Sequence, residues 1–242
     1  LENLRGLRET FSTEEYEYLG AERRELVKEI QLHTMEIKKL VREMTNARHI
    51  ANGIFLLILL GLSVWSAINP YDMQVWWTEM STVFVLVAVF GCLYKRLQLS
   101  VLSYFFIFLW CWLQVIGAHY TFELVPFESV GNFLGFERNH YDRLAHFVVG
   151  LNAVGIAELL WRYRGAPSAR AAAIYSVVII MAVANFWELV EWIYAEIDGG
   201  DADQAFLGSQ GDEWDANKDM VQDTLGGILL RCHVAAGTGA QG

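Results

Sequence analysis

The feature that most constrains this chain is a series of apolar runs, each comparable in length to a membrane-crossing helix. Six runs lie at about residues 50–68, 80–94, 99–119, 143–161, 171–197 and 217–236. A helix needs about 20 mainly apolar residues to cross the hydrocarbon core of a bilayer. The three prolines, Pro70, Pro126 and Pro167, all fall between runs, where helix breakers belong. The sequence therefore predicts an all-α, polytopic membrane protein with about six transmembrane helices, of which the sixth is the weakest because it carries charged residues.

Composition supports a membrane protein and excludes several other classes. The chain is 54% hydrophobic and only 19% charged, which is more apolar than a soluble domain of this length. Its net charge is −10, and the acidic excess lies after residue 50, which argues against binding to nucleic acid. Cys92, Cys111 and Cys232 have unrelated spacings, so neither a disulfide framework nor a thiolate metal site is expected.

The segment before the first run predicts a long, charged helix with a heptad pattern. Spacings of four and three residues alternate along Leu19, Arg23, Leu26, Ile30, His33, Ile37, Leu40 and Met44. This pattern is typical of a coiled coil, which would dimerise or dock a partner through residues 14–48. The alternative is an amphipathic helix that lies against the membrane domain of its own chain. The predicted organisation is a cytoplasmic helix at 1–49, a membrane domain at 50–236 and a short tail at 237–242.

Basic residues predict the orientation in the membrane. They cluster before the first run, between the second and third, and between the fourth and fifth: Lys38, Lys39, Arg42, Arg48, Lys95, Arg96, Arg162, Arg164 and Arg170. The stretch "NPYDMQVWWTE" and the loop at 198–215 contain neither lysine nor arginine. Because loops rich in Lys and Arg stay inside, both termini are predicted to be cytoplasmic.

This topology collects ionisable residues from four spans near the outer surface. They are His119 at the end of the third span, Asp142 and His146 in the fourth, Glu188 and Glu191 in the fifth, and Asp215, Asp219 and Asp223 in the sixth. Spacings of three or four residues place the members of each set on one helical face. A charged side chain at membrane depth costs about 2.5–3.5 kcal/mol, so such residues normally face a partner or a polar cavity. A shared site is therefore expected.

Imidazole and carboxylate groups together suit a divalent cation such as zinc or manganese. The predicted catalytic centre is Asp142, His146, Glu188 and Asp219. The predicted metal ligands are His119, His146, Glu188, Glu191, Asp215, Asp219 and Asp223. The alternative for each residue is structural: His146 could be a packing residue, and Glu188 or Glu191 could pair with Arg138 or Arg143. The "TLGG" stretch, Thr224–Gly227, indicates close helix packing by small residues.

Four blocks carry a family resemblance: "GAHYTFELVPF", "RNHYDRLAHFVVG", "NFWELVEW" and "FLGSQGDEWDANKDMVQDTLGG". In this order they resemble the YjdF-type bacterial inner-membrane proteins, whose activity is not established. The resemblance implies a six-helix fold, a location in the bacterial inner membrane, and importance for Asp142, His146, Glu188, Glu191, Asp215 and Asp219. The long N-terminal helix departs from the family pattern. The order of polar motifs is also similar, more loosely, to VanZ-like membrane proteins.

Three functions follow as hypotheses. The first is a metal-dependent membrane enzyme, a hydrolase or transferase, that acts on a lipid or envelope substrate at the outer leaflet. The second is an assembly subunit that recruits a partner through its N-terminal coiled coil, with the polar cluster only locking the helices together. The third is a proton- or cation-coupled transporter, since intramembrane carboxylates also line ion pathways.

Overall fold

The computed structural model describes residues 13–127, 133, 135, 138–198 and 209–238, apart from the side chains of residues 13–17, 198 and 230–238. Over these residues the chain forms helices and no β-strand, which confirms the predicted all-α fold. The principal helices are α2 (Thr13–Ser66), α3 (Met73–Leu97), α4 (Val101–Tyr120), η1 (Phe122–Leu124), α6 (Tyr141–Leu151), α7 (Ala153–Arg162), α8 (Ala169–Asp198) and α10 (Asp215–Thr238).

Five helical segments are long and apolar enough to cross a membrane, judged by length and composition. They are Tyr18–Ser66, Met73–Leu97, Val101–Tyr120, Tyr141–Arg162 and Ala169–Ile197, and the fourth combines α6 and α7 on either side of Asn152. They coincide with the first five predicted spans. The sixth predicted span also forms a helix, α10, which is not among the five found within the described residues, and Asp215, Lys218, Asp219 and Asp223 make its first turns polar.

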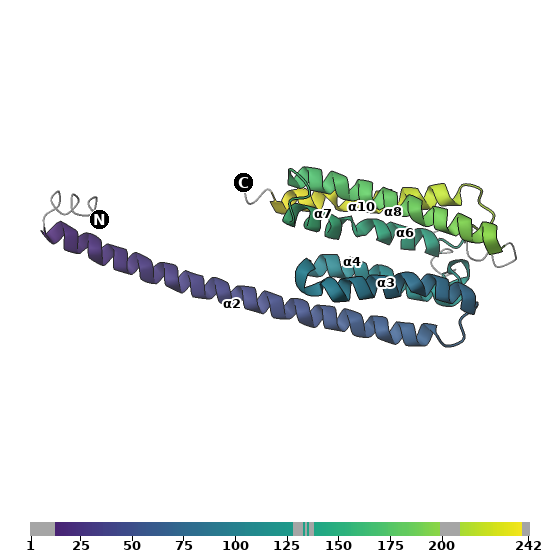
Figure 1. Ribbon diagram of the computed structural model, residues 1–242, viewed down its shortest axis with the longest axis horizontal. Helices are drawn as coiled ribbons and strands as arrows, with labels where there is room; N and C mark the ends of the chain where they lie inside the picture. Colours follow the sequence, from purple (N-terminus) through teal and green to yellow (C-terminus); the bar gives the residue numbers. More distant parts are fainter. Residues whose placement is uncertain (1–12, 128–132, 134, 136–137, 199–208, 239–242) are drawn as a thin grey trace. The chain divides into compact units, whose positions relative to one another are not determined.

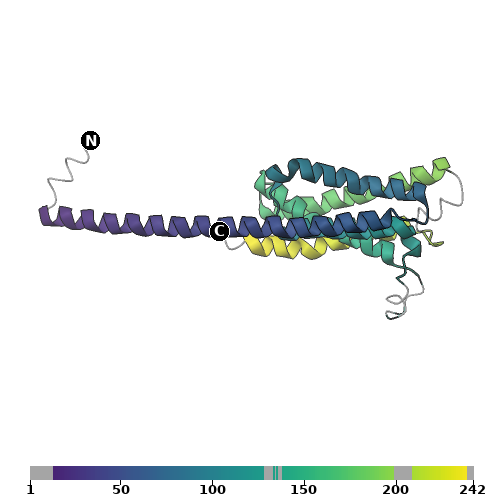
Figure 2. The ribbon, with the colours of Figure 1, turned by 90° about the horizontal axis from the view of Figure 1, so that it is seen from below.

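The chain divides into two compact units, Leu1–Ile50 and Ala51–Gly242. The first unit contains the N-terminal part of α2, which is helical from Thr13 onward (Figure 2). Along it the apolar heptad residues Leu26, Ile30, Ile37 and Leu40 are each more than half exposed. The second unit contains all the other helices and every candidate site residue.

In the second unit, the end of α2 packs with α3 and α4 around an apolar core. Met80, Cys111 and Val115 are fully buried there. One polar side chain ties the three helices together: Ser66 Oγ donates to the carbonyl of Val115 at 2.9 Å and accepts from Trp76 Nε1 at 2.9 Å. Because the Ser66 hydroxyl and the Trp76 indole N–H are buried and hydrogen-bonded, the cost of removing them from water is compensated.

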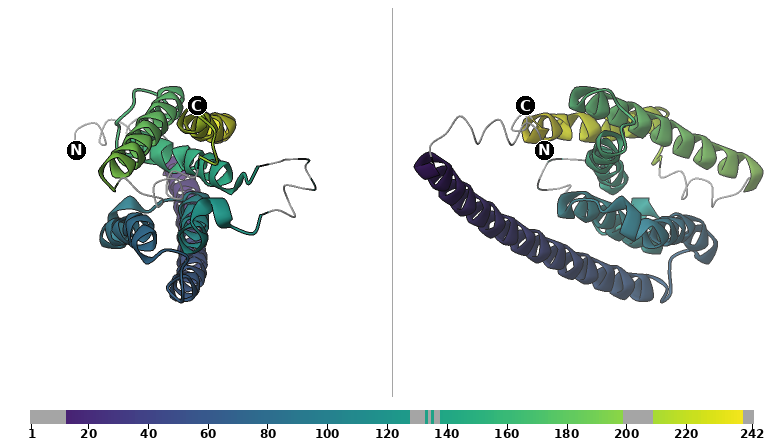
Figure 3. Two further views of the ribbon diagram at one scale, coloured as in Figure 1. Left: turned by 90° about the vertical axis from the view of Figure 1, so that its right-hand side faces the viewer. Right: turned by 60° about the vertical axis from the view of Figure 1, so that its left-hand side comes forward.

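The helices α6, α7, α8 and α10 form the other part of this unit (Figure 1). Figure 3 shows α10 lying beside α6, and glycines explain how closely they approach. A Cβ atom added at Gly150 of α6 would lie 2.1 Å from the carbonyl oxygen of Asp223, and one added at Gly226 of α10 would lie 2.1 Å from that of Phe147. The two backbones are therefore in direct contact, which confirms the prediction of close packing at Thr224–Gly227.

Candidate metal centre

The start of α6 is fixed by the side chain of Asn139. Its Oδ1 accepts the backbone N–H of Tyr141 at 3.0 Å, and its Nδ2 donates to the carbonyls of Glu123 and Val125, both at 2.8 Å. The Tyr141 hydroxyl then donates to the carbonyl of Leu113 on α4 at 2.8 Å. These bonds satisfy a free N–H at the helix start and anchor the turn from which the site residues project.

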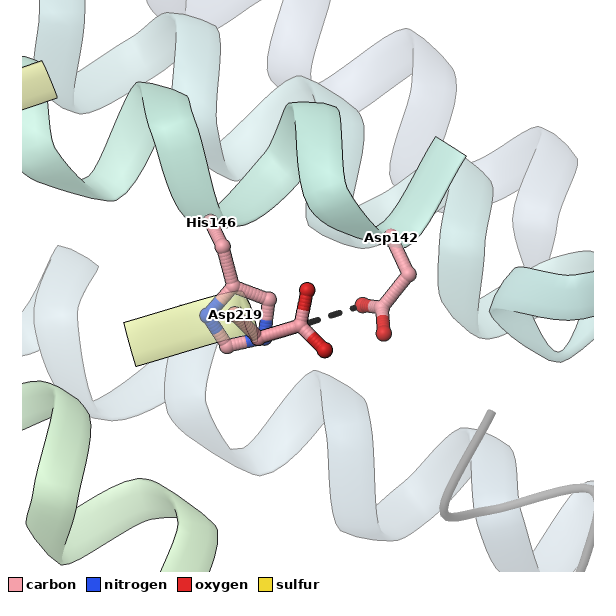
Figure 4. A group of neighbouring side chains, drawn as sticks. All are labelled: Asp142, His146 and Asp219. Atoms are coloured by element: carbon pink, nitrogen blue, oxygen red, sulfur yellow. Dashed lines mark ion pairs between the residues drawn. The ribbon is translucent and has the colours of Figure 1, made fainter. Parts of the chain in front are cut away.

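Three side chains converge where α6 meets α10. Asp142 and His146 stand one turn apart on α6, and Asp219 faces them from α10 (Figure 4). Each offers one potential ligand atom, and these atoms lie within 4.8 Å of one another. His146 and Asp219 are buried. The spacing is suited to a single cation held between one imidazole nitrogen and two carboxylate oxygens.

The two nitrogens of His146 have different environments. Nδ1 lies 2.9 Å from Oδ2 of the fully buried Asp223, so it donates its hydrogen to that carboxylate. Nε2 faces Asp142 Oδ1 and Glu188 Oε1, each 3.8 Å away. A carboxylate that holds one imidazole nitrogen fixes the tautomer and leaves the other nitrogen free to bind a metal. Asp223 therefore orients His146 in this arrangement.

Several carboxylate oxygens at this place are buried and have no hydrogen-bond partner within the described chain. They are Asp219 Oδ1, Glu188 Oε1 and Asp223 Oδ1. Burying a carboxylate without a partner is costly, and such groups are normally compensated by a paired charge or a metal ion. The group formed by Asp142, His146 and Asp219 therefore suits a divalent cation, and Glu188 of α8 lies beside it, with Oε1 3.8 Å from His146 Nε2.

Asp215, a predicted metal ligand, lies in a separate ion-pair cluster at the start of α10. Arg138 Nη2 is 2.6 Å from Asp215 Oδ1, and Arg143 Nη2 is 3.1 Å from the same atom. Asp212 joins the cluster through Arg143 at 2.8 Å and Lys218 at 2.5 Å. Asp212 lies outside the spans, and the hydrogen bond from Lys218 is the largest influence that holds the pKa of its carboxyl well below the ordinary value. This cluster fastens α10 to α6.

Two other predicted ligands remain, of which His119 makes its contacts elsewhere and Glu191 lies near the candidate centre. His119 is not part of the described ligand group: its Nδ1 is 3.0 Å from the carbonyl oxygen of Ser66, and its ring centroid is 4.3 Å from that of Trp65. It joins α4 to the end of α2. Glu191 lies about one turn beyond Glu188 on α8, within electrostatic range of Glu188 and His146.

Sequence reasoning missed a further buried carboxyl group, that of Glu79. It accepts a hydrogen bond from Gln114 Nε2 at 2.5 Å, and both side chains are buried between α3 and α4. The predicted second span began at residue 80, whereas α3 begins at Met73 and encloses Glu79. The signal available in the sequence was Asp72, whose Oδ1 caps the helix by accepting the N–H groups of Gln74 and Val75.

Membrane-crossing helices that bury a histidine among carboxylates define the class: a polytopic membrane protein with an internal polar site. Within this class, the chain belongs to the family described as predicted membrane protein DUF2238, whose model matches residues 51–237. It is 34% identical over 168 residues to the inner membrane protein YjdF of Escherichia coli (strain K12), covering 68% of this chain and 79% of that protein. The predicted relationship to YjdF-type proteins is confirmed, and the resemblance to VanZ-like proteins stays a prediction.

A shorter similarity links the chain to an enzyme. It is 56% identical over 52 residues to a glutamine synthetase of Bacteroides fragilis (strain YCH46), which is 22% of this chain but only 7% of that enzyme. The match is thus to a small part of the glutamine synthetase. No solved structure matches the chain significantly.

Proposed function

We propose that this protein is a metal-dependent enzyme of the inner membrane that acts on a lipid or envelope substrate. The location follows the description of the E. coli relative as an inner membrane protein. The metal ion is zinc or manganese, and its ligands are Asp142, His146, Asp219 and Glu188. The basic loops favour an orientation with both termini in the cytoplasm, which places the site near the outer surface.

One observation carries the proposal: the Nε2 atom of His146 faces carboxylates from three helices while Nδ1 is held by Asp223. A histidine that only packs would not need two neighbouring carboxylate oxygens buried without hydrogen-bond partners in the described chain, as Asp219 Oδ1 and Glu188 Oε1 are. A bound cation compensates both.

A divalent ion would supply a Lewis acid and a water molecule of lowered pKa. The chain's own residues provide the rest. Asp223 holds the imidazole in the required tautomer, and the Gly150–Gly226 contact brings α6 and α10 close enough for this short side chain to reach it. The apolar helices around the cluster exclude bulk water, which strengthens electrostatic interactions inside.

The metal content of the purified protein tests the proposal. After supply of zinc or manganese, the wild type should retain about one ion per chain. His146→Ala and Asp219→Asn should lose it, whereas Glu213→Gln, which removes an exposed carboxylate just before α10, should keep it. Negligible metal in all four proteins, with each shown to be folded by thermal unfolding, would remove the metal site from the account.

A second candidate function, assembly through residues 14–48, is favoured by the exposed heptad face of α2. Copies in one membrane share an orientation, so they would pair in parallel and bring equal positions together. In a cysteine-free background, Ile30→Cys should give disulfide-linked dimers and the neighbouring Gln31→Cys should not. Monomers from both variants would contradict self-association.

A further inference from the structure

Arg143 stands between the outer ion-pair cluster and the candidate metal centre. Its Nη2 atom pairs with Asp212 Oδ2 at 2.8 Å and with Asp215 Oδ1 at 3.1 Å. Its Nε atom faces inward, 3.8 Å from Asp219 Oδ1. Arg143 thus pairs with Asp212 and Asp215 through one part of its guanidinium and faces a proposed metal ligand with another.

The inward Nε–H is a buried donor without a hydrogen-bond partner among the described residues, and Asp219 Oδ1 is an acceptor in the same state. The 3.8 Å between them exceeds hydrogen-bond length, so neither atom satisfies the other. Buried polar atoms are nearly always paired, and exceptions often mark the position of a missing ligand or ion. A cation would compensate the carboxylate oxygen of Asp219. The N–H group of Arg143, in contrast, requires a ligand that carries a hydrogen-bond acceptor oxygen.

Resting on the proposed metal site, we propose that Arg143 Nε–H and the metal ion together bind a phosphoryl group. A phosphoryl group presents several anionic oxygens, so one oxygen can contact the cation while another accepts from the guanidinium. Without the cation, Asp142, Asp219 and Glu188 repel an anion. Binding of the phosphoryl group therefore depends on the metal.

The faces of the neighbouring helices indicate how the rest of such a ligand is accommodated. Leu189 and Trp192 of α8 and Val221 and Leu225 of α10 are large, apolar and exposed. Apolar helix faces of this kind suit acyl chains. A phosphorylated lipid headgroup and free inorganic phosphate both present the anionic oxygens that Arg143 would bind. Only the lipid also has acyl chains that would contact these apolar faces.

Arg138 provides a matched control. It pairs with Asp212 at 3.4 Å and with Asp215 at 2.6 Å, the same two carboxylates as Arg143. Arg143 in addition lies 3.8 Å from Asp219 through its Nε atom. Arg138→Gln therefore removes a comparable share of the outer ion pairs and leaves the inward donor in place.

The experiment measures phosphorus-31 relaxation in protein loaded with manganese, since a paramagnetic ion broadens the signal of any phosphorus bound next to it. Two probes are used separately: inorganic phosphate, and a diacylglycerol phosphate in detergent micelles. The wild type and Arg138→Gln should bind manganese and broaden at least one probe. Arg143→Gln should bind manganese equally and lose affinity for that probe by about tenfold or more, the usual effect of removing a charged hydrogen bond. Arg143→Lys, which keeps the charge, should lie between them.

The outcomes are distinct. Broadening of the lipid alone assigns the site to a headgroup, and broadening of inorganic phosphate alone assigns it to the free ion; both support the inference. Manganese binding without broadening of either probe, or equal broadening in wild type and Arg143→Gln, overturns the inference and leaves the metal site standing. Absence of manganese binding in the wild type contradicts the proposed function itself.

Discussion

His146 is the central residue of the candidate site, because its two nitrogens have different roles. One is held by a supporting carboxylate, and the other is directed at the proposed metal position. Asp223 supports it through Nδ1 at 2.9 Å, and Nε2 faces the oxygens that would share a cation. A supporting carboxylate of this kind typically contributes 10- to 100-fold, as an order of magnitude, to metal affinity.

Replacement of Asp223 should therefore weaken metal binding without removing a ligand. We expect Asp223→Ala to raise the dissociation constant for zinc by roughly 10- to 100-fold. Asp223→Asn should do less, because its amide oxygen can still accept from Nδ1. Titration with zinc against a competing chelator measures both. Equal zinc affinity in wild type and Asp223→Ala would show that Asp223 does not act through His146.

The ion pairs of Asp212 just before α10 predict how the stability of the fold changes in acid. The pKa of Asp212 is depressed in the folded protein, chiefly by the hydrogen bond from Lys218. A group with a depressed folded pKa stabilises the fold above its unfolded pKa, about 3.9 for aspartate, and loses this contribution as the pH falls further. Thermal unfolding in detergent should show Asp212→Asn less stable than wild type at neutral pH, with the difference shrinking below about pH 4. A difference that does not change with pH would contradict this role.

The sequence predicted which site residues lie together only where helical spacing places them on one face of the same helix. Asp142 and His146 are four apart, so they had to share a face. Asp215 and Asp219 have the same spacing, yet Asp215 lies closer to the arginines, 2.6 Å from Arg138, and Asp219 faces His146. Spacing along α10 does not reveal which turn of α6 each residue meets. That depends on the register of two helices, which is a tertiary property.

At the scale of the elements, the register of α6 and α10 is set by glycines. His146 precedes Gly150 by one turn, and Asp223 precedes Gly226 by about one turn, so contact between the glycines brings the two side chains together. The sequence indicated small-residue packing at Thr224–Gly227 but not its partner. Helix boundaries were predicted less well, since the Asp72 cap starts α3 before the apolar run and encloses Glu79.

A methyl group at this contact should separate the helices. We expect Gly226→Ala to lower the unfolding free energy by about 1–3 kcal/mol and to weaken metal binding, because His146 and Asp223 move apart. Gly91→Ala is the control, since a Cβ there meets nothing within 4 Å. It should leave metal binding unchanged and stabilise α3 by up to about 1 kcal/mol. Both are measured by thermal unfolding and zinc titration, and equal behaviour of the two variants would contradict the packing argument.

At the scale of the whole molecule, the sequence predicts the class of fold well because membrane helices are recognisable from length and hydropathy alone. Five predicted spans match helices that satisfy these criteria. The sixth, α10, is a helix whose polar first turns serve the site and the ion-pair cluster. In α10 these charged residues interrupt the apolar pattern on which the prediction of spans rests.

The orientation predicted from the basic loops can be tested with cysteine labelling. Glu213 and Ser168 are both exposed, and the predicted orientation has them on opposite sides of the membrane. With the exposed Cys92 replaced by serine, an impermeant maleimide added to intact cells lacking an outer-membrane barrier should label Glu213→Cys and not Ser168→Cys. The reverse pattern would place the site at the cytoplasmic surface.

The most direct test of the central claim is a crystal structure of the zinc-loaded protein with anomalous diffraction data collected at the zinc edge. We expect one strong anomalous peak between α6 and α10, about 2.0–2.2 Å from His146 Nε2 and from oxygens of Asp142 and Asp219. Zinc bound only elsewhere, with His146 Nε2 contacting no ion, would contradict it.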